Sequence, residues 1–119
     1  MRWQLTVGAL VACATLGAGF GAPRQGAQEP DGAALYKRNC RSCHGSEGVP
    51  SARMVSLYPN LKSLADSAYL ATMSVDSIVA ITRTGVGDMK PYADKLSPDE
   101  MQAIAQYVKS LAGASATKP

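Results

Sequence analysis

The stretch Cys40-Arg41-Ser42-Cys43-His44 decides how this chain of 119 residues folds. Two residues separate the cysteines, so about one turn of helix places both thiols on one side, with the His44 side chain next to them. This spacing matches the two vinyl groups of a haem, across which the thiols add to form thioethers, and it brings the histidine under the iron. The motif therefore predicts one covalently attached haem c, with Cys40 and Cys43 as attachment points and His44 as an axial ligand of the iron.

Three other chemistries use a similar spacing. A disulfide between Cys40 and Cys43 would close so short a loop that it removes little chain entropy. A thioredoxin-like redox pair needs a strand before it and a helix after it, whereas here a helical pattern precedes the motif and loop-forming residues follow. A zinc site needs a fourth ligand, but His44 is the only histidine and the chain has no second C-x-x-C. The residues therefore favour haem attachment.

The second axial ligand has to be another residue type, since His44 is the only histidine. Methionine is the usual soft partner. Met101 falls on the apolar face of a predicted helix and Met73 at a helix end, which favours a packing role for both. Met54 lies only ten residues past His44, a short path around the haem edge. Met89 lies in a glycine-rich loop far enough along the chain to reach the opposite haem face, so we expect Met89 to bind the iron.

From Asp31 onward the sequence shows helical periodicity and no strand alternation, which predicts an all-α domain. Asp31 can cap a helix that runs to about Asn39. Asp66 can cap a short helix, and Ser74 can cap another that stops at Gly85. No internal repeat is visible.

The clearest predicted helix starts at the capping box Ser97-Pro98-Asp99-Glu100, which has proline at the first helical position. Gly113 is expected to end it. Residues 45–60 are rich in Gly, Ser and Pro, which predicts a loop. The apolar side chains at helical spacing in the last helix are Met101, Ile104, Ala105, Val108 and Leu111.

Residues 1–21 have the pattern of an export signal. They carry one cation, Arg2, no acidic residue, and an apolar and small-residue run that begins at Leu5. Cleavage at a small-x-small site over residues 19–21 would remove Cys13. Alternatively, Leu10-Val11-Ala12-Cys13 resembles the lipobox of bacterial lipoproteins, in which Cys13 would be lipidated and become the first residue. A retained transmembrane helix is a weaker interpretation, because the many Gly and Ala residues make a poor anchor.

The remaining chain divides into three parts. Residues 22–30 have the Gly, Pro and Gln content of a linker, residues 31–113 form the domain, and residues 114–119 are expected to be a disordered tail. Export places the domain in the periplasm or at the outer face of the cytoplasmic membrane. Attachment to that membrane would then run through a lipid on Cys13 or an uncleaved signal.

Composition excludes one class of partner and supports the haem. Twelve Lys and Arg against nine Asp and Glu give a net charge of +3 without a basic run, which argues against nucleic-acid binding. One Trp, one Phe and five Tyr offer little bulk for a core, and a haem would supply a large apolar surface instead. Folding and haem binding should therefore be coupled.

Loss of Arg2 and gain of the haem propionates bring the net charge of the protein close to neutral. Docking to a partner should therefore use an apolar patch rimmed by Lys90 or Arg41.

Over nearly all of residues 31–113 the chain resembles the class I monohaem cytochromes c. Gly32-x-x-x-Tyr36-x-x-x-Cys40 is similar to the N-terminal helix that leads into the haem site of that family. Ile81-x-x-x-Gly85, followed by Met89 and Pro91, is similar to the C-terminal half, although Lys90 separates the methionine from the proline. The resemblance implies the small cytochrome c fold, with helices wrapped around one covalently bound haem.

The resemblance also implies two sets of contacts. The last helix of the family crosses the first, so Tyr107 and Leu111 should meet Gly32 and Tyr36. Pro59-Asn60-Leu61 is similar to the Pro-x-Leu segment of the family, whose proline carbonyl accepts a hydrogen bond from the ligand histidine. Pro59 would then orient His44 and raise its basicity.

The expected function is transfer of one electron at a time between periplasmic or membrane-bound redox proteins. With both axial positions occupied there is no open site for a substrate, so we expect a monomeric carrier and not an enzyme. Two alternatives keep the haem and change the role. One is a permanent cytochrome c subunit of an oxidase or dehydrogenase, and the other is a haem sensor with a labile sixth ligand.

Overall fold

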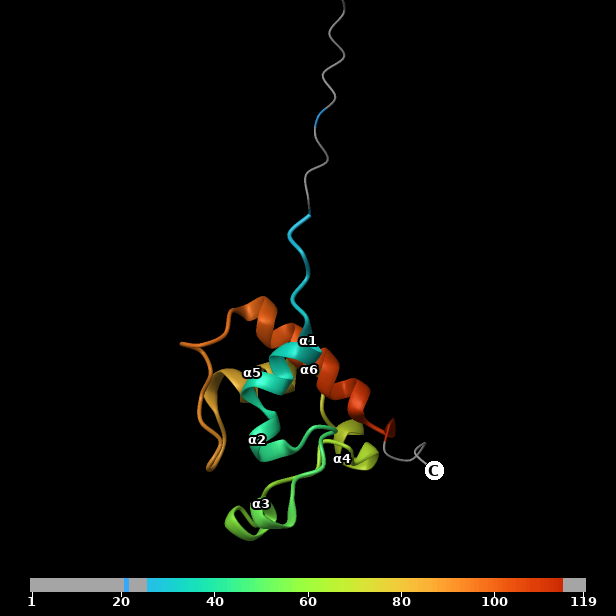
Figure 1. The fold of residues 1–119 in the computed structure, drawn as a ribbon, viewed down its shortest axis with the longest axis vertical. Coiled ribbons are helices and arrows are strands. Elements are labelled where there is room, and N and C mark those ends of the chain that lie inside the picture. Colours follow the sequence, from blue (N-terminus) through green and yellow to red (C-terminus); the bar gives the residue numbers. More distant parts are fainter. Residues whose placement is uncertain (1–20, 22–25, 115–119) are drawn as a thin grey trace, which may run out of the picture.

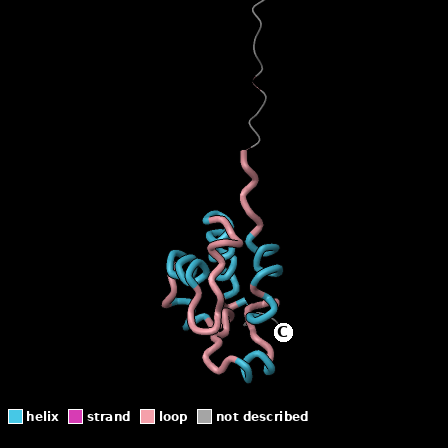
Figure 2. Tube along the Cα trace, turned by 90° about the vertical axis from the view of Figure 1, so that its left-hand side faces the viewer, coloured by secondary structure: helices cyan, strands magenta, loops and turns pink. Residues whose placement is uncertain are grey.

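The computed structural model describes residue 21 and residues 26–114, and within that part it confirms the predicted all-α fold (Figure 1). Within the described residues, the β-structure is one isolated bridge between Val86 and Met89. Figure 2 shows the described chain as helices joined by loops. The expectations for residues 1–20, 22–25 and 115–119 lie outside the described residues. The helices are α1 (Gly32–Asn39), α2 (Arg41–His44), α3 (Ala52–Leu57), α4 (Ser67–Ala71), α5 (Val75–Thr84) and α6 (Pro98–Leu111).

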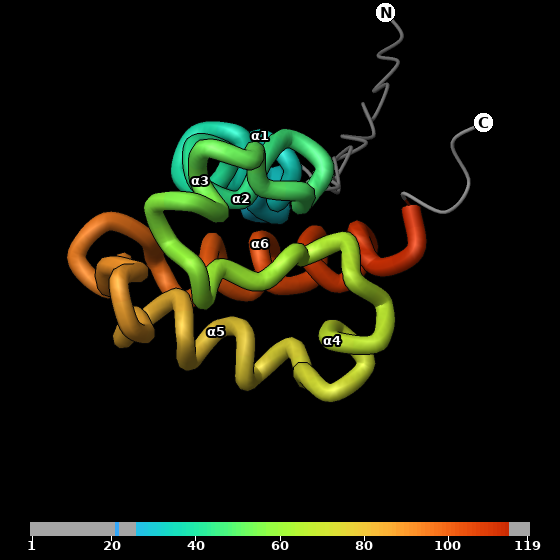
Figure 3. The backbone as a smooth tube through the Cα atoms, turned by 90° about the horizontal axis from the view of Figure 1, so that it is seen from below, coloured from blue at the N-terminus to red at the C-terminus, as the bar shows by residue number. Residues whose placement is uncertain are grey.

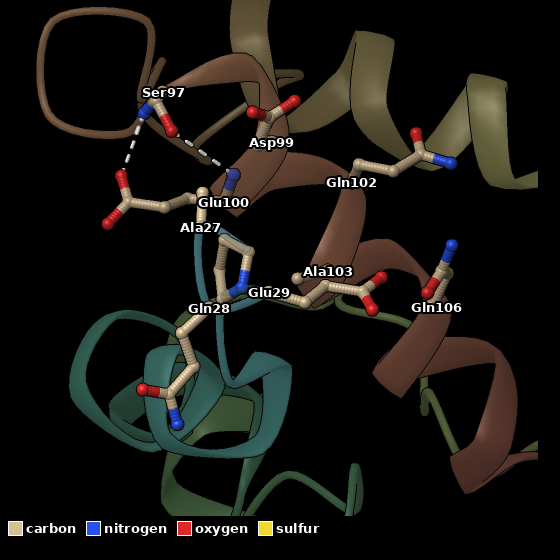
Figure 4. Close-up of a pocket in the computed structure, with 10 residues that line it drawn as sticks. Ala27, Gln28, Glu29, Ser97, Asp99, Glu100, Gln102, Ala103 and Gln106 are labelled. Atoms are coloured by element: carbon tan, nitrogen blue, oxygen red, sulfur yellow. Dashed lines mark hydrogen bonds between the residues drawn. The ribbon is translucent and has the colours of Figure 1, made fainter. Parts of the chain in front are cut away.

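The helix N-termini follow the predicted caps. The side chain of Asp31 accepts from the Ala34 amide, and those of Asp66 and Ser74 cap α4 and α5 in the same way. At α6 the Ser97 hydroxyl accepts from the Glu100 amide at 3.2 Å while the Glu100 carboxylate accepts from the Ser97 amide at 2.8 Å (Figure 4). Each cap satisfies amides that the helix itself leaves without an acceptor, so these local residues set where the helices begin.

Helix α6 lies at the centre of the domain, with α1 to α3 on one side and α4 and α5 on the other (Figure 3). All five of its predicted apolar positions are buried. They form one cluster with side chains from α1, α4, α5 and the loop before α6. The ten buried residues of this cluster are Leu35, Tyr36, Leu70, Ile78, Leu96, Met101, Ile104, Ala105, Val108 and Leu111.

The predicted crossing of the first and last helices is confirmed. The rings of Tyr36 and Tyr107 lie 5.2 Å apart between centroids and are tilted by 56°. Gly32 approaches the backbone of α6 so closely that a Cβ added there would collide with the carbonyl oxygen of Ala103. Leu111 joins Tyr36 in the same buried cluster. This crossing holds the start of the cysteine motif in place, since Cys40 directly follows α1.

The prediction of a loop over residues 45–60 is wrong for Ala52–Leu57, which form α3. The Ser51 hydroxyl accepts from the Met54 amide at 3.3 Å and starts the helix. None of the α3 side chains is buried, so the hydrophobic periodicity that identifies other helices is missing here. The base of this excursion is closed by a hydrogen bond from the Leu64 amide to the Gly48 carbonyl at 2.7 Å.

A lysine ties α6 to α4. The ammonium of Lys109 donates to the carbonyls of Leu70 and Met73, at 2.6 and 2.8 Å. Leu70 is in the last turn of α4 and Met73 follows the helix by two residues, so the ammonium lies at the C-terminal end of α4, where a cation is favourable. This contact fixes the short α4 against the long α6.

We expect Gly32→Ala to destabilise the protein by about 2 kcal/mol, although alanine is the better helix former. The added methyl group would push against the Ala103 carbonyl, which is backbone and cannot turn away. Thermal unfolding should show a melting temperature lowered by about 10 °C. Gly26→Ala is the matched control, because an added Cβ there meets nothing within 4 Å. Equal melting temperatures for the two variants would contradict the close packing of α1 on α6.

Candidate functional site

The cysteine motif occupies the turn from α1 into α2. Cys40 ends α1, where its amide donates to the Tyr36 carbonyl at 2.8 Å, and its own carbonyl accepts from the His44 amide at 3.0 Å. The motif is therefore one helical turn from its first residue to its last. Gly45 ends that turn with φ 78°, a conformation that glycine adopts without strain.

Both motif cysteines are free thiols and both are half-buried. Burial, with a smaller contribution from the nearby Cys43, raises the pKa of Cys40 to about 11. Cys40 is therefore a neutral thiol at physiological pH. Two free thiols one helical turn apart fit a group to which both sulfurs add, so the pair is suited to haem attachment.

The imidazole of His44 is buried, neutral and without a hydrogen-bond partner at Nδ1 in the described part of the protein. Burial lowers the pKa of its imidazole below the usual range, so the ring is neutral at physiological pH. Its Nδ1 is buried and has no hydrogen-bond partner in the described part of the protein. An unpartnered buried nitrogen is costly, which indicates a group whose surroundings are completed when the cofactor is bound.

Pro59 lies in the excursion between Gly48 and Leu64 that carries α3. It is exposed, and the expected hydrogen bond from His44 to its carbonyl is not formed, since Nδ1 of His44 has no partner. The role of Pro59 in orienting His44 stays a prediction.

Two tyrosine hydroxyls hold the motif at its two ends. The hydroxyl of Tyr36 donates to the carbonyl of Gly45 at 2.8 Å, directly after His44. The hydroxyl of Tyr92 donates to the carbonyl of Asn39 at 2.9 Å, directly before Cys40. Sequence reasoning placed Tyr36 only at a helix crossing and did not single out Tyr92, whose one visible signal was an aromatic side chain three residues past Met89.

Burial raises the pKa values of both phenols. The pKa of Tyr36 is raised well above its usual value, mainly by burial. Burial is also the main cause that raises the pKa of Tyr92, and Cys40 and Cys43 add to it. The Tyr92 hydroxyl bonds to the residue before Cys40, so the loop after Met89 lies beside the cysteine motif.

Met89 lies in a tight turn that follows α5. The amides and carbonyls of Val86 and Met89 pair at 3.1 and 2.9 Å, and Gly87 at the tip has φ 54°. At Gly85, where φ is 73°, a Cβ would collide with the Met89 carbonyl, so only glycine lets the turn fold back this closely. Met89 itself is half-buried. The thioether of Met89 therefore extends from a turn whose backbone is fixed by hydrogen bonds.

The other methionines have different settings. Met101 is 2% exposed within the α6 core, as the apolar pattern predicted. Met73 packs against the core and its carbonyl binds Lys109. Met54 is half-buried on α3 and is the remaining alternative to Met89. Among residues 21 and 26–114 no three His, Cys, Asp or Glu side chains gather as a metal site would require.

Comparisons with known proteins place the chain among the c-type cytochromes. The family model described as "Cytochrome C oxidase, cbb3-type, subunit III" matches residues 27–108, which include the motif and Met89. Cytochrome c6 of Microcystis aeruginosa is 32% identical over 80 residues, which cover 66% of this chain and 90% of that protein. The cbb3-type oxidase subunit CcoP of Rubrivivax gelatinosus is 38% identical over 85 residues, which are 70% of this chain but 26% of that subunit.

Solved structures agree with the sequence relatives. The KustC0563 c-type cytochrome superposes with a TM-score of 0.63 at 30% identity, over 70% of this chain and 99% of that one. Cytochrome c6C from Synechococcus sp. PCC 7002 gives a TM-score of 0.56 at 31% identity, over 70% of this chain and 95% of that one. Because the family model spans more than half of the sequence and the fold agrees, this chain belongs to the class I monohaem c-type cytochromes, electron-transfer proteins with one covalently bound haem c.

Proposed function

We propose that this chain carries one electron at a time between periplasmic or membrane-bound redox proteins, with Cys40 and Cys43 holding the haem and His44 and Met89 as axial ligands. The observation that carries the proposal is the pairing of a neutral, unpartnered His44 with two free thiols in one helical turn. Similarity to cytochrome c6 over most of that protein supports a small independent carrier.

The bound haem supplies an iron that changes between the ferrous and ferric states. The chain supplies the rest. His44 offers a neutral nitrogen, and Met89 offers a soft sulfur from the turn after α5. With both positions filled by the protein, electrons pass without binding a substrate, which is why we infer that the protein is a carrier and not itself an enzyme.

Docking is proposed to use apolar surface near the Met89 turn. Val86, at the start of that turn, is 60% exposed, and Lys90 after Met89 is exposed as well. Arg41, inside the cysteine motif, is also exposed. An apolar side chain with a few cations around it suits short-lived contact with a redox partner.

Export is part of the proposal. The apolar segment 1–21 supports delivery to the periplasm or to the outer face of the cytoplasmic membrane, where attachment through Cys13 is the alternative to free diffusion. The described helices are all too short or too polar to cross a bilayer.

If the proposal is correct, the rate of electron transfer to a partner should change by less than about threefold between low and physiological ionic strength, since the mature holoprotein is close to neutral. Stopped-flow oxidation of the reduced protein by a terminal oxidase preparation measures this. A steep dependence on salt would contradict docking through an apolar patch. No oxidation by any redox protein, with fast oxidation by a small inorganic complex, would contradict the carrier role itself.

Similarity to CcoP favours a second candidate, a permanent cytochrome c subunit of an oxidase. The two roles differ in how the protein behaves when membranes are solubilised in mild detergent. A carrier elutes alone on size exclusion, whereas a subunit elutes with a large complex that contains further haem. Elution with such a complex would decide for the subunit.

A further inference from the structure

The phenol of Tyr92 connects the two halves of the site. Its hydroxyl donates to the carbonyl of Asn39, a residue 53 positions earlier in the chain. Asn39 is the residue before Cys40, and Tyr92 follows Met89 by three residues. This side-chain hydrogen bond therefore joins the segment that holds the haem to the segment that carries the sixth ligand.

The acceptor explains why this residue is a tyrosine. Asn39 is the last residue of α1, and the last carbonyls of a helix have no intrahelical donor. The Tyr92 hydroxyl supplies one of these missing donors at 2.9 Å, in a partly buried position. A phenylalanine would fill the same space and leave the carbonyl without its partner.

Tyr92 is itself held firmly. Its amide donates to the Thr82 carbonyl of α5 at 3.0 Å, and its carbonyl accepts from the amides of Lys95 and Leu96 at 2.9 and 3.0 Å. Its ring packs against the core cluster, with the Lys95 ammonium 5.8 Å from the ring centroid. Because both the ring and the backbone of Tyr92 are held, its hydrogen bond to Asn39 also restrains the backbone next to Met89.

The Met89 turn is anchored at both of its ends. Its first residue, Gly85, is anchored through its amide to the Ile81 carbonyl at 2.7 Å, and its far end is anchored at Tyr92. Between these anchors the backbone hydrogen bonds of the described chain are those of Val86 with Met89, inside the turn itself. The Tyr92 hydroxyl ties this segment to the residue before the cysteine motif.

We propose that Tyr92 is a positioning residue whose hydroxyl holds the Met89 turn against the cysteine motif and so keeps the Met89 sulfur in reach of the iron. This inference rests on the proposed assignment of Met89 as axial ligand. Loss of the hydroxyl lets the turn open more often, while the ring of a Tyr92→Phe variant still packs against the core.

The test is displacement of the sulfur ligand by imidazole in the haem-loaded ferric protein. The loss of the iron–thioether absorption band reports the rate. Removing a hydrogen bond of ordinary net strength should raise the displacement rate of Tyr92→Phe by about fivefold, while the band is still present before imidazole is added. An unchanged rate overturns the positioning role.

Tyr69→Phe is the matched control. It removes a phenol hydroxyl from α4, which carries neither the cysteine motif nor the Met89 segment, while its ring still packs against the core. We expect a displacement rate within about twofold of the parent. Equal acceleration in both variants would show general loosening and would overturn the proposal.

The iron–thioether band also distinguishes a wrong assignment of Met89 as ligand from a wrong role for Tyr92. If Met89→Ala keeps the band, the ligand assignment fails and the proposal for Tyr92 falls with it. If Met89→Ala loses the band but Tyr92→Phe exchanges at the parent rate, Met89 remains the ligand and only the positioning role is wrong.

Discussion

Replacement of both Cys40 and Cys43 by alanine should yield an exported chain that carries no attached haem and does not fold stably. The core of the domain has ten buried apolar residues, and half of them come from α6 alone. A domain of this size with so small a core depends on its cofactor, as small metal-dependent domains do. A haem-stained gel should be negative, and circular dichroism should show most of the helix signal lost.

Cys13→Ala is the control for this experiment, because Cys13 lies in the export segment. It should leave haem attachment intact. The mass spectrum of the exported parent gives the cleavage site and any lipid on Cys13 at the same time, which tests the proposed boundary at residue 21. A haem-positive band from the double variant would contradict thioether attachment at the motif.

Met89→Ala should abolish the iron–thioether band of the ferric protein and leave one axial position of the iron open. The reason is that no other described methionine combines a loop position with a backbone turn that is anchored next to the cysteine motif. With that position open, the reduced variant should bind carbon monoxide at least about a hundredfold faster than the parent, since no protein ligand has to leave first. Absorption spectra and flash photolysis measure the two effects.

Met54→Ala is the matched control, since Met54 is the half-buried alternative on α3. It should keep the band and the slow carbon monoxide binding of the parent. Survival of the band in Met89→Ala, with loss in Met54→Ala, would move the ligand to α3. Rapid carbon monoxide binding by the parent protein would instead favour the sensor with a labile sixth ligand.

Local chemistry explains which features the sequence predicts well. The C-x-x-C-H spacing, the side-chain caps at Asp31 and Ser97 and the apolar stripe of α6 each involve residues within a few positions of one another. Their interactions form in almost any fold that contains the segment. This is why the haem motif and the helix boundaries are visible without tertiary information.

Helix α3 shows where such reasoning fails. Its side chains are all at least partly exposed, so no periodic stripe marks it, and the Gly, Ser and Pro residues around it suggest a loop. One local cap from Ser51 is enough to start it. A short exposed helix is therefore hard to distinguish from a loop, because burial against neighbours normally provides the signal.

The sequence by itself determined the haem attachment motif, the all-α class and the capped helices. Only the tertiary structure decided that Gly32 meets the Ala103 backbone, that Lys109 binds the end of α4, and that the Tyr92 hydroxyl reaches Asn39. The physical reason is distance along the chain. Helix caps and thiol spacing are satisfied within one or two turns, whereas these three contacts join segments 36 or more positions apart, and they form only when the core brings those segments together.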